Sequence, residues 1–146
     1  MFAEITEIIL AAVGSAPLDD HPEIPLRAAS DAAETAAPLI VFVPALSVFS
    51  DSLRANRTHT LTVEFTAYLP APDYDRAAVG AICDALVNAT ALSADALNSA
   101  AAELYPDSAP AFYRDLEFEE CSMSIETPVS TPCVVYTLRR SCVVQN

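Results

Sequence analysis

The chain has 146 residues and a formal net charge of −13, with seven arginines and no lysine. This length fits one domain that buries about two-thirds of its unfolded surface, so residues 1–146 are expected to form a single domain. The acidic balance repels phosphate backbones and argues against a protein that grips nucleic acid; the acid either keeps the protein soluble, or faces a basic partner, or lines a channel through which DNA slides.

The first predicted element is an amphipathic helix over residues 2–13. Phe2, Ile5, Ile9 and Val13 repeat at helical spacing, with Ile8 widening the stripe. Gly14 follows as the residue that ends the helix, because glycine readily adopts the left-handed conformation found there. After a proline-rich turn, the alanine-rich residues 28–37 predict a short surface helix.

Two strands are expected next, joined by a long loop. Residues 39–43 are a continuous β-prone run, which predicts a strand covered on both faces. Residues 58–69 alternate, with Leu61, Val63, Phe65, Ala67 and Leu69 on one face and Thr60, Thr62, Glu64, Thr66 and Tyr68 on the other.

The loop between these strands, residues 47–57, carries large apolar side chains in a polar setting. Val48, Phe49 and Leu53 are flanked by Arg54 and Arg57. Apolar groups on such a loop either fold back onto their own sheet or meet a partner surface. The five residues are therefore candidates for an interface with another subunit or protein.

Two helices are predicted after the second strand. Asp73 is expected to cap the first, whose core stripe is Val79, Ile82, Cys83 and Leu86. Ser93 is expected to cap the second, in which Leu97, Ala100, Ala101 and Leu104 share a face. Residues 106–110 then form a loop.

The last third predicts a β-hairpin of residues 114–126 and 133–144. Leu116 and Phe118 have one parity, whereas Cys121, Met123 and Ile125 have the other. A β-bulge near residues 119–120 would bring all five onto one face. The expected fold is α+β, with a mainly antiparallel sheet of about four strands against two to three helices, in the order α-β-β-α(α)-β-β.

The residues of common catalytic and cofactor sites are scarce. With only two glycines and no lysine, the chain lacks phosphate-cradling loops, the dinucleotide fingerprint and Schiff-base chemistry. The four cysteines form no C-x-x-C pair, and no histidine stands at metal-ligand spacing. We therefore expect no catalytic residue, no metal and no cofactor, and a protein that is not an enzyme.

No membrane segment or secretion signal is expected. Residues 36–46, the longest apolar run, are shorter than the roughly 20 residues of a membrane span and contain Pro38 and Pro44. Glu4 and Glu7 occupy positions that a signal peptide keeps free of acid. The chain is expected to remain in the cytoplasm in which it is made.

This order of elements, at this length, resembles the tail-terminator and head–tail joining proteins of long-tailed bacteriophages. The likeness covers residues 2–13, 39–43, 58–69, the helix after Asp73 and the hairpin 114–144; it is one of order and texture, without a diagnostic motif. Residues 28–37 have no counterpart in the family pattern.

The resemblance implies a structural virion protein, assembled in the host cytoplasm, that forms a ring, commonly a hexamer. The ring would cap the tail tube and join it to the neck of the head, with the tail-tube and neck proteins as partners. It implies that the 47–57 loop contacts neighbouring subunits or the tube. Acidic residues would face the lumen, where DNA passes without specific binding; Glu64, Glu117 and Glu119 are the candidates.

Two other functions remain open. One is a small, acidic, dimeric chaperone of the secretion type, although such proteins usually end in a helix and this chain ends in a predicted strand. The other is a small thiol-dependent enzyme with a cysteine–histidine pair assembled by the fold. Its candidate residues are Cys83, Cys121, Cys133, Cys142, His21 and His59.

Overall fold

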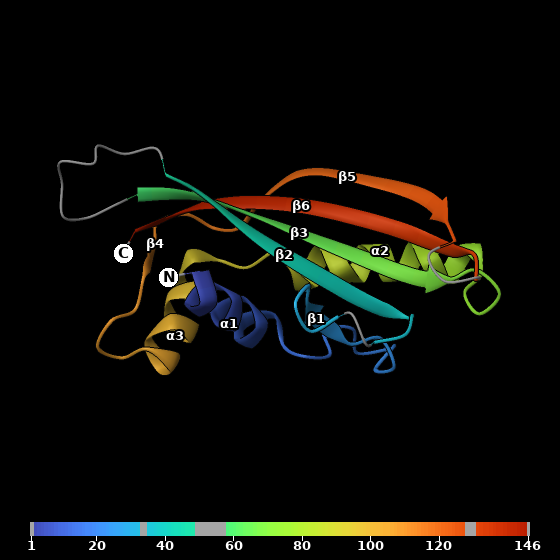
Figure 1. Cartoon of the computed structure of the whole chain (residues 1–146), viewed down its shortest axis with the longest axis horizontal. Helices are drawn as coiled ribbons and strands as arrows, with labels where there is room; N and C mark the ends of the chain where they lie inside the picture. Colours follow the sequence, from blue (N-terminus) through green and yellow to red (C-terminus); the bar gives the residue numbers. More distant parts are fainter. Residues whose placement is uncertain (1, 33–34, 49–57, 128–130, 146) are drawn as a thin grey trace.

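The computed structural model describes residues 2–32, 35–48, 58–127 and 131–145, which form an α+β fold of three helices and a six-stranded sheet (Figure 1). This confirms the expected fold class. The elements are α1 (Phe2–Val13), β1 (Leu26–Ala28), β2 (Leu39–Val48), β3 (Thr58–Pro70), α2 (Arg76–Ala89), α3 (Ala94–Leu104), β4 (Ala111–Phe112), β5 (Glu117–Glu126) and β6 (Cys133–Gln145).

The sheet is built around the antiparallel pair of β3 and β6, which are hydrogen-bonded along thirteen residues each. Its order is β1-β2-β3-β6, and both β4 and β5 pair with the remaining side of β6. β1 runs parallel to β2, so the sheet is mixed. Two strands, β1 and β4, add to the four expected; they have three and two residues, too few to show an alternating pattern.

The helices cover one face of this sheet. The predicted inward residues of β3, from Leu61 to Leu69, are all fully buried, and they pack in one cluster with residues of α1, α2 and α3. Within the cluster the rings of Phe42 and Phe65 lie 6.2 Å apart between centroids. We call the opposite side of the sheet the outer face; it carries the residues from Thr60 to Tyr68 that alternate with the core set, as predicted.

The helix ends follow local chemistry. Gly14 has φ of 92° after α1, the left-handed conformation expected of it. Ser93 caps α3 as predicted, by accepting a hydrogen bond from the Ala96 amide at 3.1 Å. The predicted cap of α2 is wrong by two residues, because Asp75, and not Asp73, accepts from the Ala78 amide at 2.8 Å.

Residues 28–37 do not form the predicted helix in their described part. Ala28 ends β1, where the chain pairs with β2, and residues 29–31 form a turn. The Ala29 amide donates to the carbonyl of Phe42 at 3.1 Å. Alanine composition favours a helix, but here hydrogen bonding to the neighbouring strand decides the conformation, and Pro38 disfavours helical geometry just before it.

β2 is longer and less covered than expected. It extends to Val48, so its last two residues, Ser47 and Val48, were wrongly assigned to the loop. Ile40 and Phe42 are fully buried in the core, whereas Val43, on the outer face, is 47% exposed. The strand is therefore not covered on both faces along its length, because the helices lie on one side only.

Arg140 interrupts the apolar face of β6 for a structural reason. Its buried guanidinium donates to the carbonyls of Val87 and Leu116, at 2.7 Å and 3.1 Å, and to the hydroxyl of Thr90 at 3.0 Å. A cation near the last turn of a helix interacts favourably with the carbonyls there. Arg140 thereby ties the end of α2 to the residue that precedes β5.

Within the described residues, no single helix has both the length and the hydropathy of a membrane span. α2 and α3 reach those values only when joined across a bend of 70°.

Candidate assembly surfaces

β5 is exposed along its whole length. All ten of its residues are exposed, including Phe118 at 53%, Met123 at 56% and Ile125 at 76%. It forms one border of the sheet, with β6 on its other side, and is the outermost strand in Figure 1. A long apolar strand at the border of a sheet is a site where another chain can pair.

The bulge predicted near residues 119–120 is present, and it sets which side of the sheet these side chains occupy. The register of β5 against β6 shifts between Phe118 and Glu120. Phe118, Cys121, Met123 and Ile125 consequently lie opposite β6 residues of the core-facing set, from Arg140 to Val134. Directly paired residues share a side of the sheet. Only Leu116, just before β5, reaches the core, at 2% exposure; the other four are exposed.

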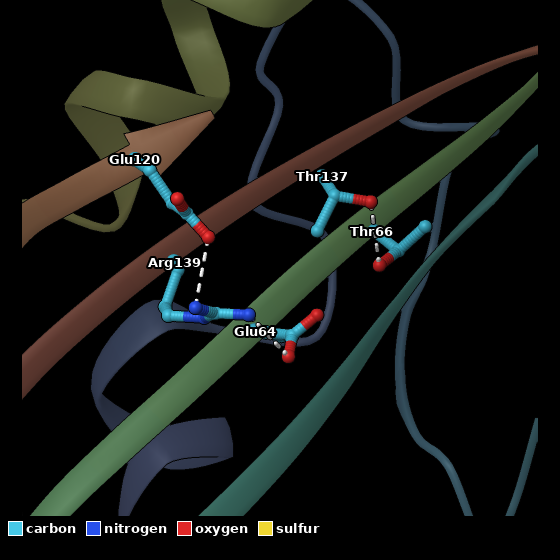
Figure 2. Close-up of polar contacts among 5 residues, drawn as sticks. All are labelled: Glu64, Thr66, Glu120, Thr137 and Arg139. Atoms are coloured by element: carbon cyan, nitrogen blue, oxygen red, sulfur yellow. Dashed lines mark hydrogen bonds and ion pairs between the residues drawn. The ribbon is translucent and has the colours of Figure 1, made fainter. Parts of the chain in front are cut away.

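The outer face carries a ladder of polar contacts across three strands (Figure 2). Arg139 of β6 lies between two carboxylates, 3.3 Å from Glu64 of β3 and 2.8 Å from Glu120 of β5. Beside it, the hydroxyls of Thr66 and Thr137 are 3.3 Å apart. These side chains are partly exposed, and exposed ion pairs contribute only about 0.2–1 kcal/mol each, so the ladder mainly orients the side chains.

The three lumen candidates lie together on this outer face. Glu64 is paired with Arg139, Glu117 is opposite Ser141, and Glu119 accepts a hydrogen bond from the Ser141 hydroxyl at 2.6 Å. Arg139 and Ser141 belong to the same side of β6, so β3, β5 and β6 bring the three carboxylates to one side of the sheet. The helices pack against the opposite, core-facing side of the sheet.

The five interface candidates of the 47–57 loop lie largely outside the described residues. The backbone of Val48 pairs with His59 at the end of β2. The side chain of Val48, and all of Phe49, Leu53, Arg54 and Arg57, lie outside. Their role stays a prediction.

The thiols and imidazoles do not meet in the described part of the chain. His21 Nδ1 contacts Glu23 at 3.1 Å, whereas neither ring nitrogen of the buried His59 has a hydrogen-bond partner. Burial raises the pKa of Cys83 to about 11 and of Cys142 to about 12, and it also raises the pKa of Cys133. Burial thus disfavours the thiolate form that a nucleophile needs at these three positions. Cys121 is exposed, on β5.

A cavity of about 490 Å³ opens on the outer face near the start of β2. Its lining residues are Ala32, Thr35, Ala36, Ala37, Leu39, Val41, Tyr68, Pro70, Asp73, Thr131 and Cys133. Asp73 is the one carboxylate among them, so the cavity offers shape and apolar surface but little reactive chemistry. Among the described residues, no group of three or more histidine, cysteine or acidic side chains is placed to hold a metal ion.

Arg139 and Glu120 are parts of the outer face that sequence reasoning missed. Both were visible as charged residues in predicted strands, but their meeting with Glu64 depends on the register of β5 and β3 against β6. The exposure of β5 was missed for a similar reason, since its alternation is the same whether or not a helix covers it.

No protein-family model matches the sequence, and no curated protein is significantly similar to it.

Proposed function

We propose that this chain is a structural virion protein of a tailed phage, which forms a ring at the end of the tail tube and joins the tube to the neck. The observation that carries the proposal is the gathering of Glu64, Glu117 and Glu119 on the face of the sheet that the helices leave uncovered. With this face turned inward, a ring would present carboxylates to passing DNA, and like charge would keep the DNA from binding.

The two faces of the subunit differ in a way that suits such a ring. The helices bury the apolar side of the sheet, so the outer face can meet a water-filled channel without exposing the core. The outer-face residues of β3 from Thr60 to Tyr68 are polar, whereas β2 places Val41 and Val43 on this face. Arg139 holds the carboxylates of Glu64 and Glu120 in place. The excess of acid over base on the face is retained, because among the described residues neither Glu117 nor Glu119 has a cation as a partner.

Subunits of a ring join through two different surfaces, because a head-to-tail contact repeats around a closed rotation. The loop of residues 47–57 is the segment expected from the sequence to supply one of these surfaces. The second surface and the number of subunits remain part of the proposal, with a hexamer as the expectation.

The test is a mass measurement of the purified protein over a wide range of concentration, by native mass spectrometry and sedimentation. The proposal expects one closed species of several identical subunits, favoured at high concentration. A single dimeric species at every concentration would instead support the chaperone alternative and would count against a ring.

A further inference from the structure

β5 offers hydrogen-bonding groups as well as apolar side chains. In a strand at the border of a sheet, alternate residues direct their N–H and C=O groups away from the neighbouring strand. Along β5 these groups face outward over ten residues, a length typical of a full partner strand. The opposite border of the sheet is β1, which has only three residues.

The charge of β5 narrows the choice of partner. Of its ten residues, four are glutamates and none is basic. Glu120 is paired with Arg139, whereas Glu117 and Glu126, near the two ends, have no ion-pair partner among the described residues. Pairing β5 with β5 of a second copy would place carboxylates beside carboxylates, which is destabilising. A basic strand would remove that repulsion.

The two sides of β5 carry different chemistry. Glu117, Glu120 and Glu126 pair with outer-face residues of β6, whereas Phe118, Met123 and Ile125 pair with residues of its core-facing side. A strand added next to β5 shares these two sides. Its side chains must therefore alternate, basic toward the outer face and apolar toward the helix side.

We propose that β5 binds an extended segment of another protein, in which arginine or lysine alternates with valine, isoleucine or phenylalanine, by adding it to the sheet as a further strand. The backbone of the segment bonds to the free side of β5, its cations lie beside Glu117 and Glu126, and its apolar side chains cover Phe118, Met123 and Ile125. This mode is β-strand addition, in which main-chain bonds give affinity and alternate side chains give specificity. The inference does not depend on the ring, since it rests on β5 alone.

The probe is a synthetic peptide of about ten residues, matched to β5, in which arginine alternates with valine. The control peptide has the same composition, with its arginines grouped in one half. We expect the alternating peptide to bind at least about tenfold more tightly at low salt, because only it can place cations and apolar groups on opposite sides. Amide hydrogen exchange is expected to slow along β5 when this peptide is added. Equal binding of the two peptides, or unchanged exchange in β5, would overturn the proposal.

The second experiment reverses the charge of two glutamates in β5. The double variant Glu117→Lys/Glu126→Lys is expected to lose roughly twofold to thirtyfold in affinity for the arginine peptide, since each of the two exposed ion pairs is worth about 0.2–1 kcal/mol. The same variant should gain affinity for a peptide in which glutamate alternates with valine. The matched control, Glu103→Lys/Asp107→Lys, changes two exposed acids in α3 and the loop after it by the same charge and should bind as wild type does. Equal loss in both variants would reduce the effect to net charge and refute a site at β5.

A second copy as the occupant would give a different result. Protection of β5 amides would then rise with protein concentration in the absence of any peptide, and the arginine peptide would compete with self-association. That outcome would overturn the proposal of a basic partner while leaving a ring possible. Binding of the arginine peptide by a protein that forms no ring would support the basic partner at β5 and count against the ring.

Discussion

Phe65 is a residue whose burial stabilises the fold. It is fully buried, and its ring packs against that of Phe42. Phe65→Ala is expected to lower the free energy of unfolding by about 3–5 kcal/mol, because the cavity left behind adds to the lost burial. Urea denaturation measures this change.

The exposed Phe118 is the matched control for Phe65. Phe118→Ala removes the same group from a side chain that is 53% exposed, so its effect on unfolding should stay within about 0.5 kcal/mol. A loss at Phe65 below about 1 kcal/mol, or one equal to that at Phe118, would mean that the two faces of β3 are assigned the wrong way round.

Buried thiols make stability depend on alkaline pH. Burial raises the pKa of Cys142 to about 12 from an ordinary value of 9, so the folded chain keeps a proton that the unfolded chain releases above pH 9. The stabilising contribution is therefore fully present below pH 9 and is lost as the pH rises toward 12. Cys142→Ala should lower stability at neutral pH but flatten this alkaline decline. Equal slopes in the variant and the wild type, measured by urea denaturation from pH 8 to 11, would contradict it.

At the scale of elements, the periodic patterns of the sequence predicted which face of a helix or strand is buried. The stripe of α2 and the alternation of β3 were both correct, because each repeats over enough residues to mark one face. The bulge in β5 was also predictable, since the apolar parity changes at one point in the sequence. Each of these signals lies within a single element.

Other features depend on what lies beside an element and could not be predicted. In place of the helix expected over residues 28–37, Ala28 ends β1, whose formation depends on the neighbouring β2, and residues 29–31 form a turn. The exposure of β5 depends on how far the helices extend, and the Glu64–Arg139–Glu120 ladder depends on the register of three strands. Long-range placement of this kind has no local sequence signal.

The start of α2 offers a test with two neighbouring aspartates. Asp75 accepts a hydrogen bond from the Ala78 amide, whereas the backbone of Asp73 lies in the turn after β3, bonded to Pro70. Asp75→Ala should cost about 1 kcal/mol of stability, because the Ala78 amide in the first turn of α2 loses its hydrogen-bond acceptor. Asp73→Ala should cost clearly less. A larger loss of stability in Asp73→Ala than in Asp75→Ala would mean that Asp73 caps α2, as the sequence predicts.

At the scale of the whole molecule, the distribution of acid matters more than its amount. We expect the triple variant Glu64→Lys/Glu117→Lys/Glu119→Lys to bind duplex DNA in a salt-dependent way, because it gathers new cations around Arg139 on the outer face. The control is Asp84→Lys/Glu103→Lys/Asp107→Lys, which has the same net charge but spreads the change over α2, α3 and the loop after α3.

Gel-shift titration of the two triple variants at low and moderate salt compares them directly. Stronger binding by the outer-face variant would agree with a surface that keeps DNA away by its carboxylates. Equal binding by the two variants would show that net charge alone governs contact with DNA. It would contradict the proposed role of the outer-face carboxylates.

Electron microscopy of the concentrated protein tests the ring most directly, because it shows both the assembly and the orientation of its subunits. The account predicts closed rings in which the outer face, with Glu64 and Glu117, lines the channel and α1, α2 and α3 lie outside. Rings with the helices toward the channel, or an absence of rings at every concentration, would contradict it.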